Sequence, residues 1–357
     1  MSPDIGRNYP GGRVRVLGFG TYDVARHPRA GVLLDGLRAH GDEVVELNEP
    51  LGFSTAERVA MLARPWLAYR LVCRLLVRWT TLVRRRISIR TAWPAEGGTT
   101  IDAVIVGYLG QFDVLLARLL FPRTRIVLDL LILAADTASD RGERSGPKLR
   151  LLSWLDSLAI RCADVIVVDT EEHRQLLRPD AWGKVVVVAV GAPPRWFGDG
   201  GASERPPAGP LRVAFFGLYT PLQGARVIGA ALDLLAAETT RAGTEELAVT
   251  MIGTGQDYQA TRTAAAANRS VTWLEWLDPD QLPGLIATHH VCLGVFGTSP
   301  KALRVVPNKV YQGAAAGCAI VTSATEPQRR ALADDAIFVP PGDPVALCAA
   351  LTALARD

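Results

Sequence analysis

The stretch LRVAFFGLYTPLQGARVIGAA, residues 211–231, decides the fold of this chain. Its first seven residues form an apolar run that ends in glycine, which is typical of a buried parallel strand. Helical spacing then begins at Gly224, so the stretch predicts a strand, a turn and a helix. A helix N-terminus presents free N–H groups and a partial positive charge, and this turn therefore suits a phosphate group.

The same alternation of strand and helix extends over both halves of the chain. In the second half, strands are expected at 211–217, 247–253, 271–275, 290–296, 318–322 and 336–340, and helices at 224–238, 257–267, 280–289, 308–316, 326–334 and 344–356. In the first half, strands are expected at 13–19, 43–47, 101–107, 125–131, 164–169 and 185–190, and helices at 27–41, 109–121 and 147–162. Alternation of this kind predicts parallel sheets covered on both faces.

The segment GAPPRWFGDGGASERPPAGP, residues 191–210, separates the two halves and is dense in glycine and proline. It reads as a linker. The expected fold class is therefore α/β, with two doubly wound, Rossmann-like parallel-sheet domains that face a cleft. We expect an N-terminal domain over 1–195, a linker over 196–210 and a C-terminal domain over 211–357, with the last helix near the domain junction and in contact with the first domain.

The composition excludes several classes of protein. The 39 basic and 36 acidic residues leave a net charge of +3, which is too small to indicate nucleic-acid binding. No GxxxxGK[ST], GxSxG or HExxH motif occurs, and we expect no metal and no cofactor. The five cysteines stand singly, as expected of small buried side chains in a reducing cytoplasm. No apolar run is long enough to predict a transmembrane helix.

The first glycine turn, GFGTYDVARHP at 18–28, resembles the opening of a dinucleotide fingerprint but lacks the third glycine. Two interpretations remain open. The turn could be only a tight backbone reversal after a strand, or it could open toward a second substrate, the acceptor. On the second interpretation the acceptor-side residues are Gly20, Thr21, Asp23 and His27.

Further signals for an anionic ligand lie in the second half. The segment IGTGQDY, 252–258, repeats the strand–glycine arrangement with Gly253 and Gly255. The segment FGTSPKALRVVPNKVYQGAAAGCAIVT, 296–322, places Lys301, Arg304 and Lys309 between two expected strands. Pro307 can begin a helix, so Asn308 and Lys309 would fall in its first turn. Cations there oppose the helix dipole, and a diphosphate would compensate them; a solvated basic loop is the alternative.

These turns and PNKVYQGAAAGCAIVT, in this order and spacing, resemble the donor domain of retaining, nucleotide-sugar-dependent glycosyltransferases of family-four type, which have the GT-B fold. RIVLD (125–129) and CADVIVVDT (162–170) resemble the family's acceptor domain. The resemblance implies transfer of a sugar from a nucleotide diphosphate sugar with retention, without a metal. It implies a donor site formed by Gly217, Gln223, Gly224, Gly253, Gly255, Lys301, Asn308 and Gln312.

The chain departs from the family in its glutamate pair and in its cationic pair, whose arginine has no clear counterpart in Leu218–Tyr219. The two glutamates of the family's Glu-x7-Glu pair fall on Arg304 and Gln312, and the lysine after the first glycine loop is replaced by Gln223. Gln312 can still hydrogen-bond a ribose diol, whereas Arg304 cannot imitate a carboxylate. We therefore expect the cluster to compensate for Gln223, with Arg304 and Lys309 as the catalytic cations that stabilise the departing diphosphate.

The departures leave alternatives open. The chain could be a non-catalytic GT-B homologue, a pseudo-glycosyltransferase that couples rings other than sugars, or a sugar-nucleotide epimerase. The acceptor, small or lipid-linked, is not identified by the residues.

One stretch, residues 64–90, is apolar and rich in arginine. As a helix it would place Arg70, Arg74 and Arg78 on one stripe and Leu71, Leu75, Trp79 and Leu82 on another. This pattern suits either an amphipathic helix on an anionic membrane or a helix packed on its own domain. The expected location is the cytoplasm, with peripheral contact at the inner membrane face as the alternative that this stretch raises.

Overall fold

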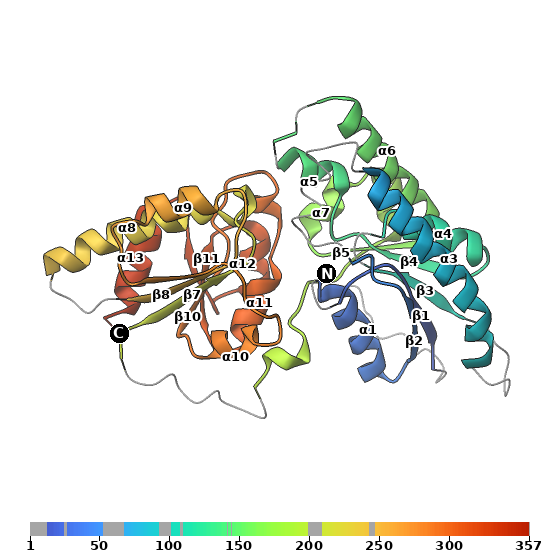
Figure 1. The fold of residues 1–357 in the computed structure, drawn as a ribbon, viewed down its shortest axis with the longest axis horizontal. Helices are drawn as coiled ribbons and strands as arrows, with labels where there is room; N and C mark the ends of the chain where they lie inside the picture. Colours follow the sequence, from blue (N-terminus) through green and yellow to red (C-terminus); the bar gives the residue numbers. More distant parts are fainter. Residues whose placement is uncertain are drawn as a thin grey trace. The chain divides into compact units, whose positions relative to one another are not determined.

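The computed structural model describes residues 13–24, 27–52, 68–92, 101–107, 110–140, 142–143, 145–198, 209–242 and 247–356. The chain forms two separate six-stranded sheets, and by its internal contacts it divides into two compact units (Figure 1). The first unit contains residues up to Ile132 together with Trp154–Val167 and Lys184–Val186. The second contains Leu133–Ser153, Val168–Gly183 and residues from Val187 onward. The expectation of two doubly wound α/β halves is confirmed, whereas the boundaries at 195 and 211 and the cleft remain predictions.

The first sheet has the strand order β2-β1-β3-β4-β5-β6, and the pairs from β2 to β5 are parallel. Each of its strands overlaps a strand expected from the sequence, and the observed and expected ends differ by at most three residues. The strands are β1 (Arg15–Gly20), β2 (Glu43–Asn48), β3 (Ala103–Val106), β4 (Arg125–Asp129), β5 (Val165–Val168) and β6 (Val185–Val187). Leu17, Phe19, Ile126 and Leu128 are fully buried in this sheet, which is why these strands read as continuous apolar runs.

The helices of this half include two that the sequence did not predict. They are α1 (Arg29–His40), α3 (Ala68–Ala92), α4 (Asp113–Leu120), α5 (Ala134–Asp140), α6 (Pro147–Cys162) and α7 (Glu171–Leu176). The unpredicted helices are α5 and α7, which are seven and six residues long and too short for a periodic apolar pattern. A local signal for α7 exists, because the Thr170 hydroxyl accepts a hydrogen bond from the His173 N–H and caps the helix.

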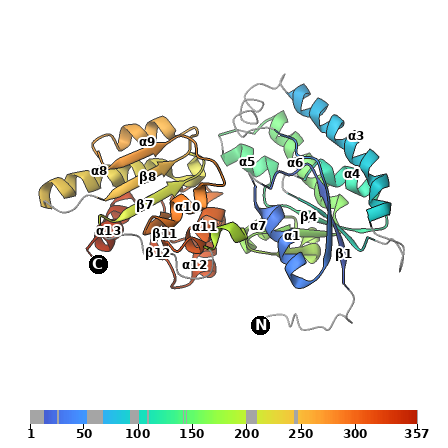
Figure 2. The ribbon, with the colours of Figure 1, turned by 60° about the horizontal axis from the view of Figure 1, so that its bottom comes forward.

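Helix α3 lies beside α4 in both views (Figures 1 and 2). The stripe that the sequence offered as a membrane-facing surface is the packed one. Leu75 and Leu82 are buried, and the Trp79 indole N–H donates to Asp113 at the start of α4. These side chains therefore pack on the first unit, which agrees with the alternative of a helix packed on its own domain, and contact of the helix with a membrane remains a prediction. Residues 64–67 of the stretch lie outside the described residues.

The second sheet has the strand order β12-β11-β10-β7-β8-β9, and all five of its strand pairs are parallel. Its strands are β7 (Arg212–Phe216), β8 (Ala248–Ile252), β9 (Val271–Leu274), β10 (Val291–Leu293), β11 (Ala319–Ser323) and β12 (Ile337–Val339). Its helices are α8 (Ala225–Ala242), α9 (Tyr258–Ala264), α10 (Leu282–Ala287), α11 (Asn308–Ala315), α12 (Glu326–Leu332) and α13 (Pro344–Leu354). Short 3-10 turns lie at η2 (Pro179–Lys184), η3 (Pro194–Trp196), η4 (Pro221–Gln223) and η5 (Ala302–Arg304).

Alternate residues of β7 build the two cores of this sheet. Val213 and Phe215 pack with residues of α8 and α13, while Ala214 and Phe216 pack with residues of α10 and α11. Figure 1 shows α8 and α10 on opposite sides of the sheet. Burial of each large aliphatic side chain contributes about 1.5–3 kcal/mol, so both faces hold the strand ends, and the turns after them, in fixed positions. Among the described residues, no helix is long and apolar enough to cross a bilayer.

Candidate donor and acceptor sites

Two neighbouring strands of the second sheet end in glycines that touch each other. Gly217, after β7, has φ +135°, and Gly253, after β8, has φ +112°. A Cβ added to Gly253 would lie 2.1 Å from the Gly217 carbonyl oxygen. The Gly217 N–H donates to Ile252 and the Gly253 N–H to Leu274. Only glycine allows this approach, which keeps the carboxyl ends of β7 and β8 free of side-chain bulk.

The turn from Gly217 to Gly224 is fixed by contacts to the loop after β10. Gly224 has φ +65°, and a Cβ there would lie 2.4 Å from the backbone of Phe296 and of Gly297. The Phe296 N–H donates to the Gln223 carbonyl oxygen. Gly255 meets the backbone of Tyr219 in the same way, with a Cβ at 2.5 Å from the carbonyl oxygen. Any larger residue at Gly224 would therefore displace the two loops from each other.

Lys309 lies on the first turn of α11, as the sequence predicted, and its ammonium group is buried. The residue is 5% exposed, and its Nζ lies 3.7 Å from the centre of the Phe215 ring. The same nitrogen is 3.2 Å from the point where a Cβ on Gly217 would be. Among the residues that the structure describes, no hydrogen-bond acceptor meets it. Burial lowers the pKa of Lys309 to about 7 because removal from water disfavours the charged form.

Two other residues of the predicted donor site lie close to Lys309 along the chain. Asn308 precedes Lys309, and Gln312 follows it by three residues, which places it on the same side of α11. Gln312 is buried. The Asn308 and Gln223 side-chain oxygens are buried without a hydrogen-bond partner in the described part of the chain. Buried polar atoms without partners are few in proteins and point to a ligand or water at such places.

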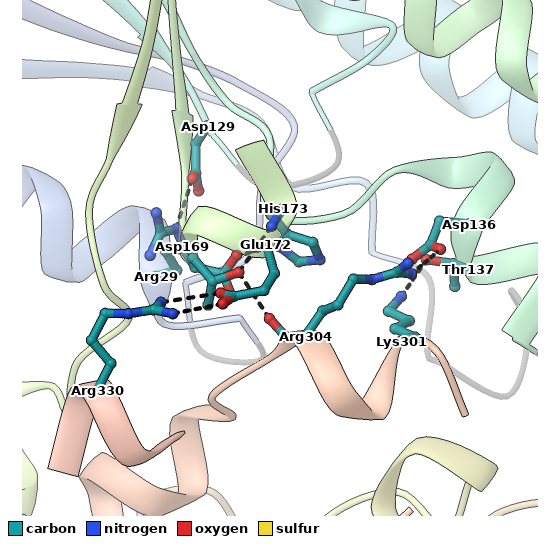
Figure 3. Close-up of polar contacts among 11 residues, drawn as sticks. Arg29, Asp129, Asp136, Thr137, Asp169, Glu172, His173, Lys301, Arg304 and Arg330 are labelled. Atoms are coloured by element: carbon teal, nitrogen blue, oxygen red, sulfur yellow. Dashed lines mark hydrogen bonds and ion pairs between the residues drawn. The ribbon is translucent and has the colours of Figure 1, made fainter. Parts of the chain in front are cut away.

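The other two cations of the predicted cluster have protein partners (Figure 3). The Lys301 ammonium donates to the Thr137 hydroxyl at 2.6 Å, and Arg304 forms an ion pair with Asp136 at 2.5 Å. Both partners lie on α5, which Ser299 also contacts through Asp140. The three cations therefore differ: Lys309 faces the Gly217 turn and has no hydrogen-bond acceptor among the described residues, whereas Lys301 and Arg304 hold α5.

A second group of polar residues meets the same loop from α7, and the sequence analysis missed it. The Thr170 hydroxyl donates to the Arg304 carbonyl oxygen at 2.8 Å, and Glu172 forms an ion pair with Arg330 of α12 at 2.7 Å (Figure 3). Arg330 lowers the pKa of Glu172 by its hydrogen bond. Asp169 and His173 form a buried pair beside them. Asp169 and Thr170, directly after an apolar strand, were the available signal, since strand ends carry ligands or loop contacts in such sheets.

In the first unit, the turn after β1 that was predicted to lie on the acceptor side is organised by a carboxylate that the sequence analysis also missed. Gly20 has φ +144°, and a Cβ there would lie 2.9 Å from Asp113 Oδ2. The Thr21 N–H and hydroxyl both donate to that oxygen, at 2.7 and 2.8 Å, and Trp79 donates to the other at 2.8 Å. Burial raises the pKa of Asp113, against the effect of these hydrogen bonds.

The remaining acceptor-side residues lie in the loop that leads into α1. The His27 N–H donates to the Asp23 carbonyl oxygen at 2.8 Å, and both residues are half-buried. Arg29, in the first turn of α1, is 2% exposed and forms an ion pair with buried Asp129 at the end of β4. This ion pair fixes the start of α1 against the sheet (Figure 3). In the described residues, no group of three or more His, Cys, Asp or Glu side chains could hold a metal ion.

Comparison with known proteins adds the family and the fold. Residues 210–357 match the family described as Glycosyl transferases group 1. Comparison of the sequence with curated proteins gives no match. Three similar solved structures cover almost the whole chain. Sucrose-phosphate synthase from Thermosynechococcus elongatus has a TM-score of 0.65 at 13% identity, with 97% of this chain and 90% of that chain covered.

A trehalose-phosphate synthase (UDP-forming) from Burkholderia vietnamiensis has a TM-score of 0.58 at 14% identity, with 97% and 90% covered. A glycosyltransferase from Rickettsia africae has a TM-score of 0.58 at 11% identity, with 96% and 88% covered. At these identities the structures establish a shared fold, and the family match establishes the class of reaction. Residues 210–357 thus match the group 1 glycosyl transferases, and the chain is a nucleotide-sugar-dependent glycosyltransferase with the GT-B fold.

Proposed function

We propose that the chain transfers a sugar with retention from a nucleotide diphosphate sugar whose diphosphate lies at the Gly217 turn against Lys309. The observation that carries this proposal is the buried Lys309 ammonium with no acceptor in the described residues. An unpaired buried cation is costly, and a diphosphate oxygen would supply the missing partner. The trehalose-phosphate synthase among the similar structures is described as UDP-forming, which is the product expected of such a donor.

The glycines and the polar side chains are proposed to have different roles in donor binding. Gly217 and Gly253 leave room at the ends of β7 and β8, and Gly224 and Gly255 hold the turn in place. Gln312, on the same side of α11 as Lys309, is proposed to hydrogen-bond the ribose diol. The free side-chain oxygens of Asn308 and Gln223 are proposed to accept hydrogen bonds from the donor sugar or base.

The transfer reaction depends more on stabilising the charge of the leaving diphosphate than on a general base. As the glycosidic bond breaks, the leaving diphosphate gains charge, and a fixed cation beside it stabilises the transition state more than the bound donor. Lys309 can do this when protonated. Its pKa of about 7 in the free protein will rise when a diphosphate binds beside it, because an anion favours the charged form. Donor binding is therefore expected to take up a proton above neutral pH.

Lys301 and Arg304 are proposed to act around the same diphosphate from the η5 loop, Arg304 as a second catalytic cation. Their bonds to Thr137 and Asp136 hold this loop against α5. Gly20, Thr21, Asp23 and His27 are proposed to meet the acceptor, small or lipid-linked.

The decisive experiment compares Lys309→Met with Lys301→Met and Arg304→Met. Nucleoside diphosphates and their sugars are first screened by thermal shift, where a ligand at 100 times its Kd adds about 2.7 kcal/mol of stability. For the ligand found, calorimetry gives the Kd of each variant. We expect Lys309→Met to weaken binding most. If Lys309→Met binds the ligand as the wild type does, the donor site lies elsewhere.

A second candidate is a non-catalytic homologue, favoured by one observation. The position of the family's first glutamate is Arg304, and this side chain is paired with Asp136. A protein of this kind would bind a nucleotide sugar without breaking it. Slow hydrolysis of the donor by purified protein, absent in Lys309→Met, distinguishes an enzyme from a binding protein, and analysis of the sugar products detects an epimerase.

A further inference from the structure

The face of α3 that packs on the first unit is well defined. Leu82 is fully buried and Leu75 is 8% exposed. Trp79 donates to Asp113, and the Arg86 guanidinium lies 5.0 Å from the centre of the Phe121 ring. Successive residues are about 100° apart around a helix, so these four side chains occupy one sector of roughly 60°. The helix therefore has a fixed orientation on the protein.

A second apolar sector of α3 points away from the protein. Val72 and Leu76 are each 52% exposed, Tyr69 is 63% exposed, Val77 61% and Val83 42%. At about 100° per residue these side chains span an arc of roughly 140°, next to the packed sector. Five exposed apolar side chains on one side of a helix mark an interaction surface, whereas single exposed apolar residues do not.

The rest of the helix surface is basic. The segment 68–92 contains seven arginines and no acidic residue or lysine. Arg70, Arg74 and Arg84 are exposed. At about 100° per residue, Arg84 falls within the arc of the apolar stripe, Arg70 about 20° beyond its edge and Arg74 about 60° beyond it. Glu49 of the neighbouring β2 loop pairs with Arg78 and Arg85, on the side of the helix away from the stripe's centre. The charge at the stripe is therefore positive.

We propose that the exposed stripe of α3, formed by Tyr69, Val72, Leu76, Val77 and Val83, docks on an anionic lipid surface. The apolar side chains would enter the boundary between headgroups and acyl chains, and the bordering arginines would meet lipid phosphates. A second copy of the chain is a poorer partner. A symmetric contact through this stripe brings Arg70, Arg74 and Arg84 of two identical helices together, and residues 68–92 contain no carboxylate to pair with them.

The docking helix is joined to the acceptor-side turn by hydrogen bonds. Trp79, on the packed sector of α3, and Thr21, after β1, donate to the two oxygens of the same Asp113 carboxylate. The surface that meets lipid and the turn proposed to meet the acceptor therefore lie on one rigid set of contacts in the first unit. Lipid docking does not depend on the proposed donor site, because binding to vesicles can be measured without any nucleotide.

The test is sedimentation of the full chain with vesicles of equimolar phosphatidylcholine and phosphatidylglycerol, and with vesicles of phosphatidylcholine alone. We expect the wild type to bind the anionic vesicles at low salt and to be released as salt rises. Leu76→Ser with Val77→Ser should lower the partition coefficient about tenfold or more, as loss of buried aliphatic surface predicts. Arg70→Gln with Arg84→Gln should lower it about fivefold for each arginine.

The matched control is Val345→Ser with Trp276→Ser, which removes exposed apolar side chains from the second unit. It should sediment as the wild type does, and the thermal midpoints of all variants should stay close to that of the wild type. Failure of the wild type to bind anionic vesicles at low salt overturns the proposal. So does equal binding by the α3 variants and the control. If the wild type is a dimer in solution and Leu76→Ser with Val77→Ser makes it a monomer, a second copy covers the stripe and the proposal is wrong.

Discussion

The first strand of each sheet ends in a glycine turn, and the two turns meet side chains of opposite charge. The Gly20 turn faces the Asp113 carboxylate, which accepts hydrogen bonds from Thr21 and Trp79. The Gly217 turn faces the Lys309 ammonium, which has no acceptor in the described residues. The first turn is complete within the protein, while the second lacks a partner. A complete charge network stabilises a fold, and an incomplete one indicates where a ligand binds.

The largest expected effect comes from removing the Lys309 ammonium, which has no hydrogen-bond acceptor in the described residues. Lys309→Met should reduce turnover of a confirmed donor about 100- to 1,000-fold, as loss of one transition-state donor does in other enzymes. The same variant should leave the fold at least as stable, because a desolvated cation becomes an apolar side chain of similar length. Steady-state kinetics and thermal unfolding measure the two effects. Loss of stability together with unchanged turnover would make Lys309 a structural residue.

The complete network should respond in the opposite way. Asp113→Ala removes the acceptor of three hydrogen bonds and leaves the half-buried donors of Thr21 and Trp79 without their partner. We expect the free energy of unfolding to fall by about 2–4 kcal/mol, while nucleoside diphosphate affinity stays within about twofold. Denaturant unfolding and calorimetry provide the measurements. A large loss of affinity in a folded Asp113→Ala protein would contradict the division of roles between the two turns.

A pH series sharpens the comparison because Lys309 titrates near neutrality. Burial lowers its pKa from 10.5 to about 7, so the unfolded state binds more protons between these values. Stability of the ligand-free protein should therefore rise with pH from about 7, by up to about 1.4 kcal/mol per unit.

Affinity for a nucleoside diphosphate should fall over the same pH range, by up to about tenfold per unit, because the ligand needs the protonated amine. In Lys309→Met, neither the stability nor the nucleoside diphosphate affinity should change with pH in this way. Wild-type and variant profiles that run parallel would show that another group titrates.

The smallest effect is expected for the cation that already has a partner. Arg304→Met breaks the ion pair with Asp136, which is about one-fifth exposed on each side. We expect a loss of about 1 kcal/mol or less in stability and a smaller fall in turnover than for Lys309→Met. Asp136→Asn is the matched control for the ion pair. If Arg304→Met lowers turnover far more than Asp136→Asn does, Arg304 acts on the donor as a cation and not only through α5.

The helix α3 shows what periodicity can predict and what it leaves open. The spacing of Arg70, Arg74 and Arg78 predicted the helix, and the structure contains it. The apolar residues fell into two stripes, and only packing could decide which one faces the protein. Leu75 and Leu82 are buried and Trp79 is held by Asp113 at the start of α4, while Val72 and Leu76 remain exposed.

The sequence by itself determined the strand–helix alternation, the two sheets and the glycine turns, since these depend on local period and on backbone conformations that favour glycine. It also placed Lys309 in the first turn of a helix. The tertiary structure alone decided the partners of the three cations: Arg304 and Lys301 meet α5, and Lys309 lies over Phe215. It also revealed the contacts of Asp113 with Thr21 and of Thr170 with Arg304. Thr21 and Asp113 are 92 positions apart in the sequence, and Thr170 and Arg304 are 134 positions apart. No local sequence pattern encodes a contact between residues so far apart.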